Sequence, residues 1–163
     1  MVTDVVRLHL ADAEATAALG AALARVLRAG DLVILTGDLG AGKTTLTQGL
    51  GRALGVRGQV ASPTFVIARE HAPLADGPGL VHVDAYRLGG LTELDALDLD
   101  SSLAESVTVV EWGAGLTETL AEDRLDVVID RARGDAVDEG RQVSVRGIGA
   151  RWDGVDLAAA LQA

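Results

Sequence analysis

The sequence predicts a single α/β domain spanning residues 1–163. Apolar segments of strand length alternate along the chain with stretches whose apolar residues recur at helical spacing. Residues 31–37 form a short apolar run, which is typical of a strand buried on both faces of a parallel sheet. Two further strand-like segments are joined by a link rich in proline and glycine, which indicates a hairpin. A chain of this length can bury one proper core.

The N-terminal segment predicts a strand followed by a helix. Residues 5–10 are expected to form the strand, and Asp12 can cap a helix that covers 13–29. Gly30 is a natural stop for that helix. The apolar residues that keep helical spacing are Ala15, Leu19, Ala22, Leu23, Val26 and Leu27.

The next part of the chain predicts a strand, a helix and a hairpin. The strand at 31–37 leads through a glycine-rich turn into a helix over 43–54, which Gly55 ends. Hairpin strands are expected at 64–71 and 80–86, because the link between them contains two prolines and two glycines.

The C-terminal half completes the α/β pattern. An acidic stretch at 92–105 is expected to be helical, and buried strands are expected at 107–112 and 125–130. Residues 141–148 alternate in the manner of an edge strand, and 154–162 form a short closing helix. No repeat, low-complexity tract or linker interrupts the domain.

Composition limits the class of protein and its partners. The chain has no cysteine, which excludes disulfides, thiolate metal sites and cysteine nucleophiles. It has neither a secretory signal nor an apolar run long enough for a membrane helix, so we expect a soluble cytoplasmic protein. The net charge is −10 without a cluster of Lys and Arg, so any contact with nucleic acid is expected to be made mainly by a partner.

The glycine-rich turn matches the phosphate-binding pattern G-x-x-x-x-G-K-[ST] without a mismatch. Glycines allow the backbone N–H groups to converge on phosphate oxygens, and the following helix adds the positive end of its dipole. The nucleotide-binding candidates are Gly37, Asp38, Leu39, Gly40, Ala41, Gly42, Lys43 and Thr44, with Thr45 next in the same helical turn.

Lys43 is the only lysine in the chain, and the other thirteen of the fourteen basic residues are arginines. A compact ammonium on a slim stem can reach the β- and γ-phosphates inside the loop, where a planar guanidinium would not fit. The retained lysine therefore supports a nucleoside triphosphate site independently of the glycine pattern.

Two carboxylates follow apolar strands and are candidates for the magnesium side of the site. Asp84 ends one predicted strand, and Glu111 stands at the same place in another. In a parallel sheet the active edge lies at the carboxyl ends of the strands, so one of these residues is expected to bind Mg²⁺ and the other to hold a water. Spacing alone does not decide which residue does which.

Thr64 is a third candidate, in the sequence ASPTF. A threonine hydroxyl on a loop after the phosphate-loop helix can sense a γ-phosphate, as switch loops of GTPases do. A turn residue that satisfies its own backbone explains the same position equally well.

Four segments, GDLGAGKTTLTQGL, ASPTFVIAREH, VHVDAYRL and VTVVEWG, together closely resemble the TsaE (YjeE) family of small bacterial P-loop ATPases. The order of P-loop, S-P-T, H-x-D-x-Y-R and E-W-G is specific, and the resemblance runs from the N-terminal helix to about residue 148. It implies a P-loop NTPase-like sheet of mixed strand direction flanked by helices. It also implies binding of ATP and Mg²⁺.

The resemblance implies a role in making threonylcarbamoyladenosine at position 37 of tRNAs that read codons beginning with A. The implied partner is the TsaB–TsaD heterodimer, through which tRNA is reached indirectly. In this family ATP hydrolysis supports turnover of the complex, and the protein does not itself transfer the threonylcarbamoyl group.

Carried over by motif, the resemblance makes Thr44 and Glu111 the Mg²⁺ ligands, with Lys43 as the phosphate-binding lysine. It places Asp84 on the family's Walker-B-like aspartate and Thr64 on its switch-like threonine. Trp112 and Arg141 match residues near the nucleotide, although on sequence pattern alone Trp112 is a plain core aromatic.

Two other functions fit a P-loop. A small-molecule kinase has a similar length, but helices and an arginine-bearing lid usually follow its loop, where this sequence predicts a hairpin. A non-catalytic switch would bind ATP and dock a partner without useful turnover. Dependence on one small acceptor or on a protein partner distinguishes these functions.

Overall fold

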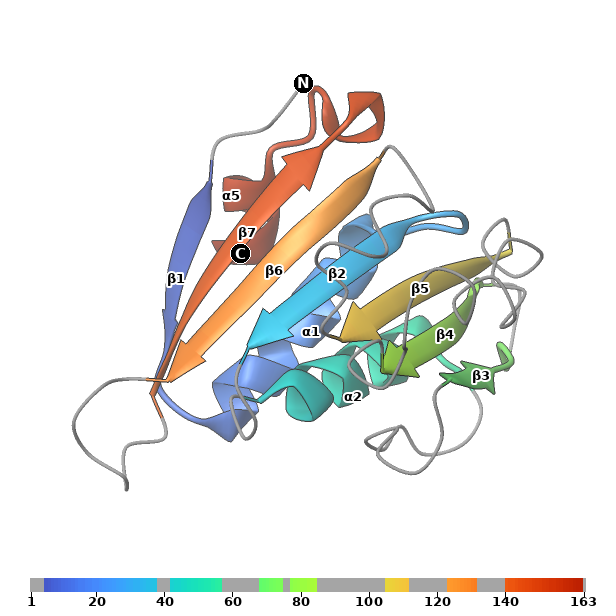
Figure 1. Ribbon diagram of the computed structural model, residues 1–163, viewed down its shortest axis with the longest axis horizontal. Helices are drawn as coiled ribbons and strands as arrows, with labels where there is room; N and C mark the ends of the chain where they lie inside the picture. Colours follow the sequence, from blue (N-terminus) through green and yellow to red (C-terminus); the bar gives the residue numbers. More distant parts are fainter. Residues whose placement is uncertain are drawn as a thin grey trace.

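The computed structural model describes residues 5–37, 42–56, 68–74, 77–84, 105–111, 123–131 and 140–162. Within these residues the chain forms a seven-stranded sheet in the order β1-β7-β6-β2-β5-β4-β3 (Figure 1). The strands are β1 (Val6–Leu10), β2 (Leu32–Gly37), β3 (Ala68–His71), β4 (Gly79–Asp84), β5 (Ser106–Glu111), β6 (Arg124–Arg131) and β7 (Arg141–Ile148).

The sheet is of mixed direction, as the family resemblance implied. Strand β2 is parallel to both of its neighbours, β5 and β6, and β4 is parallel to β5. At one side β7 runs antiparallel to β6 and β1 antiparallel to β7, while at the other side β3 and β4 form the predicted antiparallel pair. The α/β class and the hairpin are therefore confirmed.

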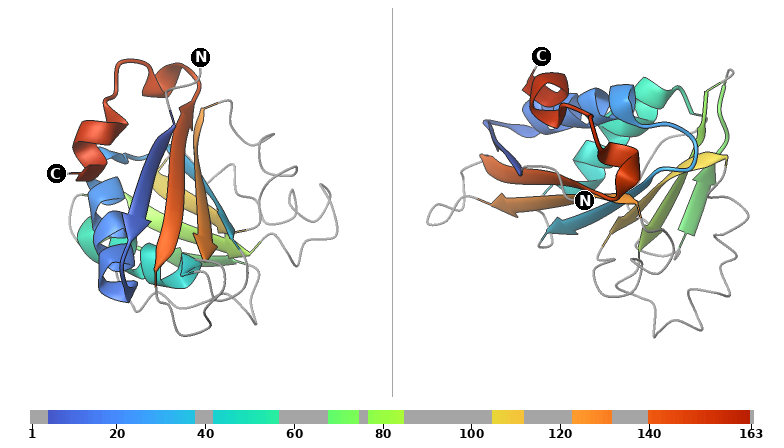
Figure 2. Two further views of the ribbon diagram at one scale, coloured as in Figure 1. Left: turned by 90° about the vertical axis from the view of Figure 1, so that its left-hand side faces the viewer. Right: turned by 90° about the horizontal axis from the view of Figure 1, so that it is seen from above.

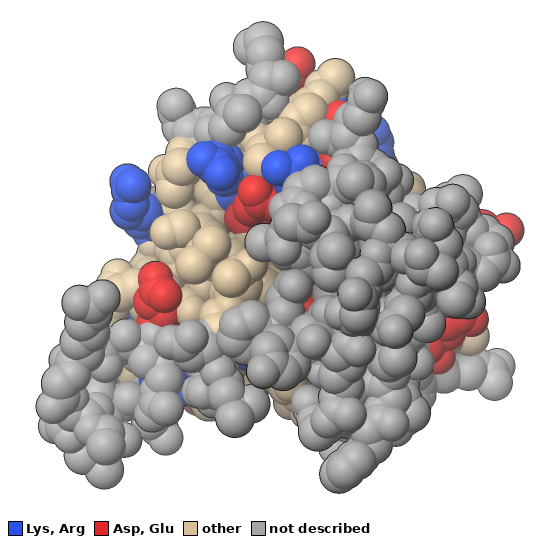
Figure 3. Space-filling model, in the orientation of Figure 1, with Lys and Arg blue, Asp and Glu red and all other residues tan. Residues whose placement is uncertain are grey.

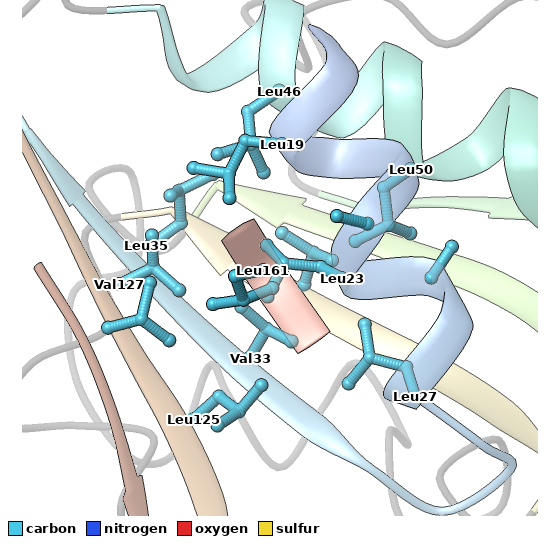
Figure 4. Close-up of a cluster of buried hydrophobic side chains, with 14 of the residues drawn as sticks. Leu19, Leu23, Leu27, Val33, Leu35, Leu46, Leu50, Leu125, Val127 and Leu161 are labelled. Atoms are coloured by element: carbon cyan, nitrogen blue, oxygen red, sulfur yellow. The ribbon is translucent and has the colours of Figure 1, made fainter. Parts of the chain in front are cut away.

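The described helices cover one face of the sheet. Helices α1 (Ala13–Val26), α2 (Lys43–Leu54) and α5 (Leu157–Gln162) lie on the same side (Figure 2). Their leucines point toward β2 and β6 in the core (Figure 4). The residues labelled there are Leu19, Leu23 and Leu27 near α1, Leu46 and Leu50 on α2, Leu161 on α5, Val33 and Leu35 on β2, and Leu125 and Val127 on β6.

Two glycines let α1 and α2 touch backbone to backbone. A Cβ atom added at Gly20 would lie 2.0 Å from the carbonyl oxygen of Leu46, and one at Gly49 would lie 2.0 Å from that of Ala17. Any side chain at either position would force the helices apart. This contact fixes α2, whose first residue is Lys43, against the rest of the core.

Helix α1 ends at Val26, three residues before the predicted end at 29. Groups outside the helix form hydrogen bonds with the backbone there and so replace the bonds that would continue it. Leu27 has an extended backbone, and the N–H of Arg28 donates to the Asp31 carboxylate at 2.8 Å. The carbonyl oxygen of Val26 accepts a hydrogen bond from Arg151 at 2.8 Å. The end of this helix is thus fixed by a residue far away in the sequence.

Strand β7 is not at an edge, so the edge assignment from its alternating pattern is wrong. It lies between β1 and β6. Its alternation arises because only one face is covered by helices: Val143 and Val145 are buried, whereas Gln142 and Arg146 are exposed. The predicted acidic helix at 92–105 falls almost entirely outside the described residues.

The C-terminal segment is shorter in regular structure than predicted. A 3-10 turn at Ala150–Trp152 precedes α5, which begins at Leu157 rather than at residue 154. Across the described part of the chain, no helix is long and apolar enough to span a membrane.

Candidate active site

The candidate site lies at the edge where the parallel strands end. Gly37 is the last residue of β2, Glu111 of β5 and Asp84 of β4. The register places Glu111 beside Leu35 of β2 on one side and beside Asp84 on the other. The two carboxylate residues that the sequence singled out are therefore direct neighbours, close to the start of the phosphate loop.

The loop ends at Gly42, which has the backbone conformation that the motif requires. Its φ angle is +111°, a region that side-chain-bearing residues rarely adopt. Gly42 is also the N-cap residue of α2, and it offers no side-chain cap. The first N–H groups of a helix lack intrahelical partners, so α2 presents donors and a positive dipole end here.

Lys43 is folded back over the beginning of the loop. It is 7% exposed, and its Nζ donates a hydrogen bond to the carbonyl oxygen of Gly37. The buried Thr47 hydroxyl donates to the carbonyl oxygen of Lys43 at 2.8 Å, which anchors this first turn of α2. Thr44 and Thr45 are half-buried in the same turn.

Glu111 is a buried carboxylate, 4% exposed, with a histidine beside it. The Nε2 atom of His82 lies 3.4 Å from Oε2 of Glu111, and the His82 side chain is fully buried. His82 is two residues before Asp84 on β4, and Asp84 pairs with Glu111 on β5. The imidazole of His82 therefore contacts Glu111 diagonally across the two strands.

Several predicted site residues are not described. Asp38, Leu39, Gly40 and Ala41 lie outside the described residues, as do Thr64 and Trp112. For Asp84 the backbone and its register are described. The assignments of these residues stay predictions.

Arg141 lies at the same edge of the sheet as Gly37 but two strands away. It is the first residue of β7 and pairs with Arg131, the last residue of β6. Since β6 separates β7 from β2, the lateral distance between the two strands is about 10 Å. Its position near the nucleotide stays a prediction.

His71 lies at the other end of the hairpin from the strand-end carboxylates. It pairs with Leu80, four positions before Asp84, or about 13 Å along the strand. His82, two residues before Asp84, is the histidine that contacts a site residue.

Thr16 lies beside Gly42, the last residue of the loop, and was missed by sequence reasoning. It is 2% exposed on α1, and a Cβ at Gly42 would lie 3.4 Å from its methyl carbon. The helical spacing of α1 shows which residues are buried, but it does not show that this threonine meets the phosphate loop. That contact depends on how α1 and α2 cross.

The described groups fit a magnesium nucleotide. The helix N-terminus and Lys43 suit phosphate oxygens, and a hydroxyl with carboxylates suits Mg²⁺, which usually completes its shell with water and phosphate. Within the described ranges no cluster of three or more His, Cys, Asp and Glu side chains gathers in a way that could hold a metal alone.

Comparison with known proteins identifies the family. A family model described as "Threonylcarbamoyl adenosine biosynthesis protein TsaE" matches residues 10–143. A Streptomyces coelicolor protein named "tRNA threonylcarbamoyladenosine biosynthesis protein TsaE" is 66% identical over 141 residues, which cover 86% of this chain and 95% of that protein. A protein of the same name from Mycobacterium leprae is 53% identical over 74% of this chain and 79% of its own length.

A solved structure has the same fold. The crystal structure of Bacillus subtilis YdiB matches with a TM-score of 0.74 and 33% identity, over 99% of this chain and 96% of that one. The family match covers the phosphate loop, both strand-end carboxylates and most of the sheet. The chain therefore belongs to the TsaE family.

Proposed function

We propose that this protein is the ATP-binding and ATP-hydrolysing component of the machinery that makes N6-threonylcarbamoyladenosine at position 37 of tRNAs reading codons that start with A. The observation that carries the proposal is the meeting of the Gly42–Lys43 helix start with Glu111 and Asp84 at one sheet edge, in a chain of the TsaE family. The whole chain, residues 1–163, would act as one P-loop ATPase domain in the cytoplasm.

The phosphate end of ATP would be bound by the first turn of α2. The N–H groups of this turn would donate to phosphate oxygens, and Lys43 would exchange its hydrogen bond to the Gly37 carbonyl for contacts with the β- and γ-phosphates. The predicted loop residues Asp38–Ala41 would complete the cradle. The hydrogen bond of Lys43 to Gly37, at the start of the loop, supports this role.

The metal side of the site would be formed by Thr44 and Glu111. Bound Mg²⁺ would neutralise negative charge on the β- and γ-phosphates. The Thr44 hydroxyl and the Glu111 carboxylate would hold it, and Asp84, the neighbour of Glu111 in register, would hold the attacking water. Thr64 would sense the γ-phosphate, and Trp112 and Arg141 would lie near the nucleotide.

The partner in this proposal is the TsaB–TsaD heterodimer, with tRNA reached through it. Its basis is the family membership together with the net charge of −10, which disfavours direct binding of a polyanion. We expect slow turnover by the protein alone. A small-molecule kinase is the alternative, and the β3–β4 hairpin stands where such kinases usually have helices.

Substitutions of Lys43, Glu111 and Asp84, together with one control, test the site. Lys43→Ala is expected to weaken ATP binding and to lower hydrolysis about 100-fold or more, because it removes charge stabilisation at the transferred phosphate. Glu111→Ala is expected to keep much of the ATP affinity measured in EDTA but to abolish Mg²⁺-dependent hydrolysis. Glu70→Ala, which removes an exposed carboxylate on β3, is the matched control and should behave like the parent protein.

Asp84→Ala separates the roles of the two carboxylates. We expect it to keep the Mg²⁺-dependent gain in ATP binding while losing hydrolysis, because a water-positioning group acts after the metal is bound. Loss of the Mg²⁺-dependent gain in ATP binding in Asp84→Ala, with that gain kept in Glu111→Ala, would reverse the metal assignment. Normal hydrolysis in both variants would contradict the proposed site.

A further inference from the structure

The imidazole of His82 is fully buried, and hydrophobic packing alone does not explain why a polar ring stands at this position. Neither of its ring nitrogens has a hydrogen-bond partner among the described residues. A buried polar group without a partner costs about 1–3 kcal/mol, so an apolar side chain would serve the core of β4 better. The role of this ring therefore depends on the polar group that lies next to it.

What it faces is the Glu111 carboxylate. The separation of 3.4 Å between Nε2 and Oε2 is about 0.5–0.7 Å longer than a charge-assisted hydrogen bond. Both side chains lie on the helix-covered face of the sheet, since Leu80 and Val109, two residues before each, belong to the core cluster. A neutral imidazole with its proton on Nε2 would donate to Oε2.

The surroundings of Glu111 explain why such a donor matters. The carboxylate is 4% exposed, so water contributes little to fixing its orientation or to stabilising its charge. A side chain on the adjacent strand is held by the β4–β5 ladder, in which His82 pairs with Val109 and Asp84 with Glu111. The ring is therefore placed by rigid backbone rather than by a loop.

We infer that His82 is a positioning residue for Glu111: its Nε2–H holds Oε2 and so leaves Oε1 free to bind the metal. This inference rests on the proposed function, since it concerns the same carboxylate. Groups that orient metal-binding carboxylates through hydrogen bonds commonly change metal affinity or activity by about 10–100-fold when removed. In this role the imidazole itself would touch neither nucleotide nor metal.

Three substitutions of His82 test the inference. His82→Gln keeps an N–H donor at about the position of Nε2, His82→Asn keeps a donor that is too short to reach Glu111, and His82→Leu removes the donor. His71→Leu is the matched control, because it removes another buried histidine of the same sheet. His71 is on β3 and pairs with Leu80, at the end of β4 that is far from Asp84. The measurements are ATP binding by calorimetry in EDTA, ATP binding at graded Mg²⁺, and the Mg²⁺ concentration for half-maximal hydrolysis.

In EDTA all four variants are expected to bind ATP within about twofold of the parent protein. With Mg²⁺, His82→Leu and His82→Asn should need about 10–100-fold more metal, in binding and in hydrolysis alike, whereas His82→Gln and His71→Leu should follow the parent. If His82→Leu does not fold, the Gln and Asn pair decides. Equal Mg²⁺ dependence in that pair, or an equal shift in His71→Leu, overturns the inference.

The parent protein separates this inference from the proposed function. If Mg²⁺ neither strengthens ATP binding nor supports hydrolysis in the parent, the proposed function fails. If the parent depends on Mg²⁺ and His82→Asn does so equally, the proposed function stands and only the role of His82 is lost.

Discussion

The two halves of the sheet differ in how they are buried, and the candidate site belongs to one of them. In the parallel half, β2, β5 and β4, residues on both faces are buried: Val109 and Val110, successive on β5, are each 0% exposed. The other half, β6, β7 and β1, is called the antiparallel half because β7 runs antiparallel to both of its neighbours, although β6 is parallel to β2. In this half only the helix-covered face is buried. On the other face Val128 is 36% exposed.

The open face of the antiparallel half is polar and carries charges of both signs, which Figure 3 shows in the orientation of Figure 1. There Asp126 forms ion pairs with Arg124 at 3.1 Å and with Arg146 at 3.7 Å. The parallel half is buried on both faces, and it places Gly37, Glu111 and Asp84 at its carboxyl edge. The candidate site therefore lies at the end of the strands that are buried on both faces.

The largest expected effect on stability comes from an ion pair that joins the two halves. Arg151, just after β7, donates from Nε and a terminal nitrogen to Asp31, just before β2, with both distances 3.0 Å. Both side chains are largely buried. Arg151→Ala leaves the Asp31 charge without this partner and is expected to lower the free energy of unfolding by about 3–5 kcal/mol in urea titrations.

Arg146→Ala is the matched control for that substitution. Arg146 also pairs with an aspartate, but its side chain is 46% exposed and the contact is 3.7 Å. The expected loss is below about 1 kcal/mol. Equal losses for the two arginines would show that the halves are not joined in the way described.

A smaller effect tests the difference in burial directly. Val110 and Val128 lie on the same face of the sheet, because Ile34 pairs with Val110 on one side and with Asp126, two residues before Val128, on the other. Val→Thr keeps the shape and adds a hydroxyl. Val110→Thr buries that hydroxyl and should cost about 1–3 kcal/mol, whereas Val128→Thr should stay within about 0.5 kcal/mol of the parent. Thermal and urea unfolding measure both, and similar losses at both positions would remove the contrast between the halves.

The sequence predicted those parts of the fold and site that depend on local patterns. The phosphate loop, the strand that precedes it and the helix that follows could be recognised because their glycines, apolar run and lone lysine are close together in the chain. Asp84 and Glu111 could be placed at strand ends for the same reason. Their neighbouring positions were not predictable from spacing, since these depend on β4 lying next to β5.

The errors and omissions share a physical cause. The alternation of polar and apolar residues in β7 indicates that one face of the strand is exposed. An interior strand shows the same pattern when helices cover only one face of the sheet, so the pattern does not identify an edge strand. The end of α1 is set by Arg151, 125 positions after Val26. Two other contacts also join segments that are far apart in the sequence, so no local pattern predicts them. They are the contact of His82 with Glu111 and the close approach of α1 and α2 at Gly20 and Gly49.

The most direct test of the central claim is ATP hydrolysis by the purified protein, alone and with the TsaB–TsaD pair and tRNA. We predict Mg²⁺-dependent turnover that is slow for the protein alone and markedly faster with the pair, and that is lost in Lys43→Ala under both conditions. Turnover by the protein alone on the order of 10 per second, or indifference to the pair, would contradict a partner-stimulated ATPase.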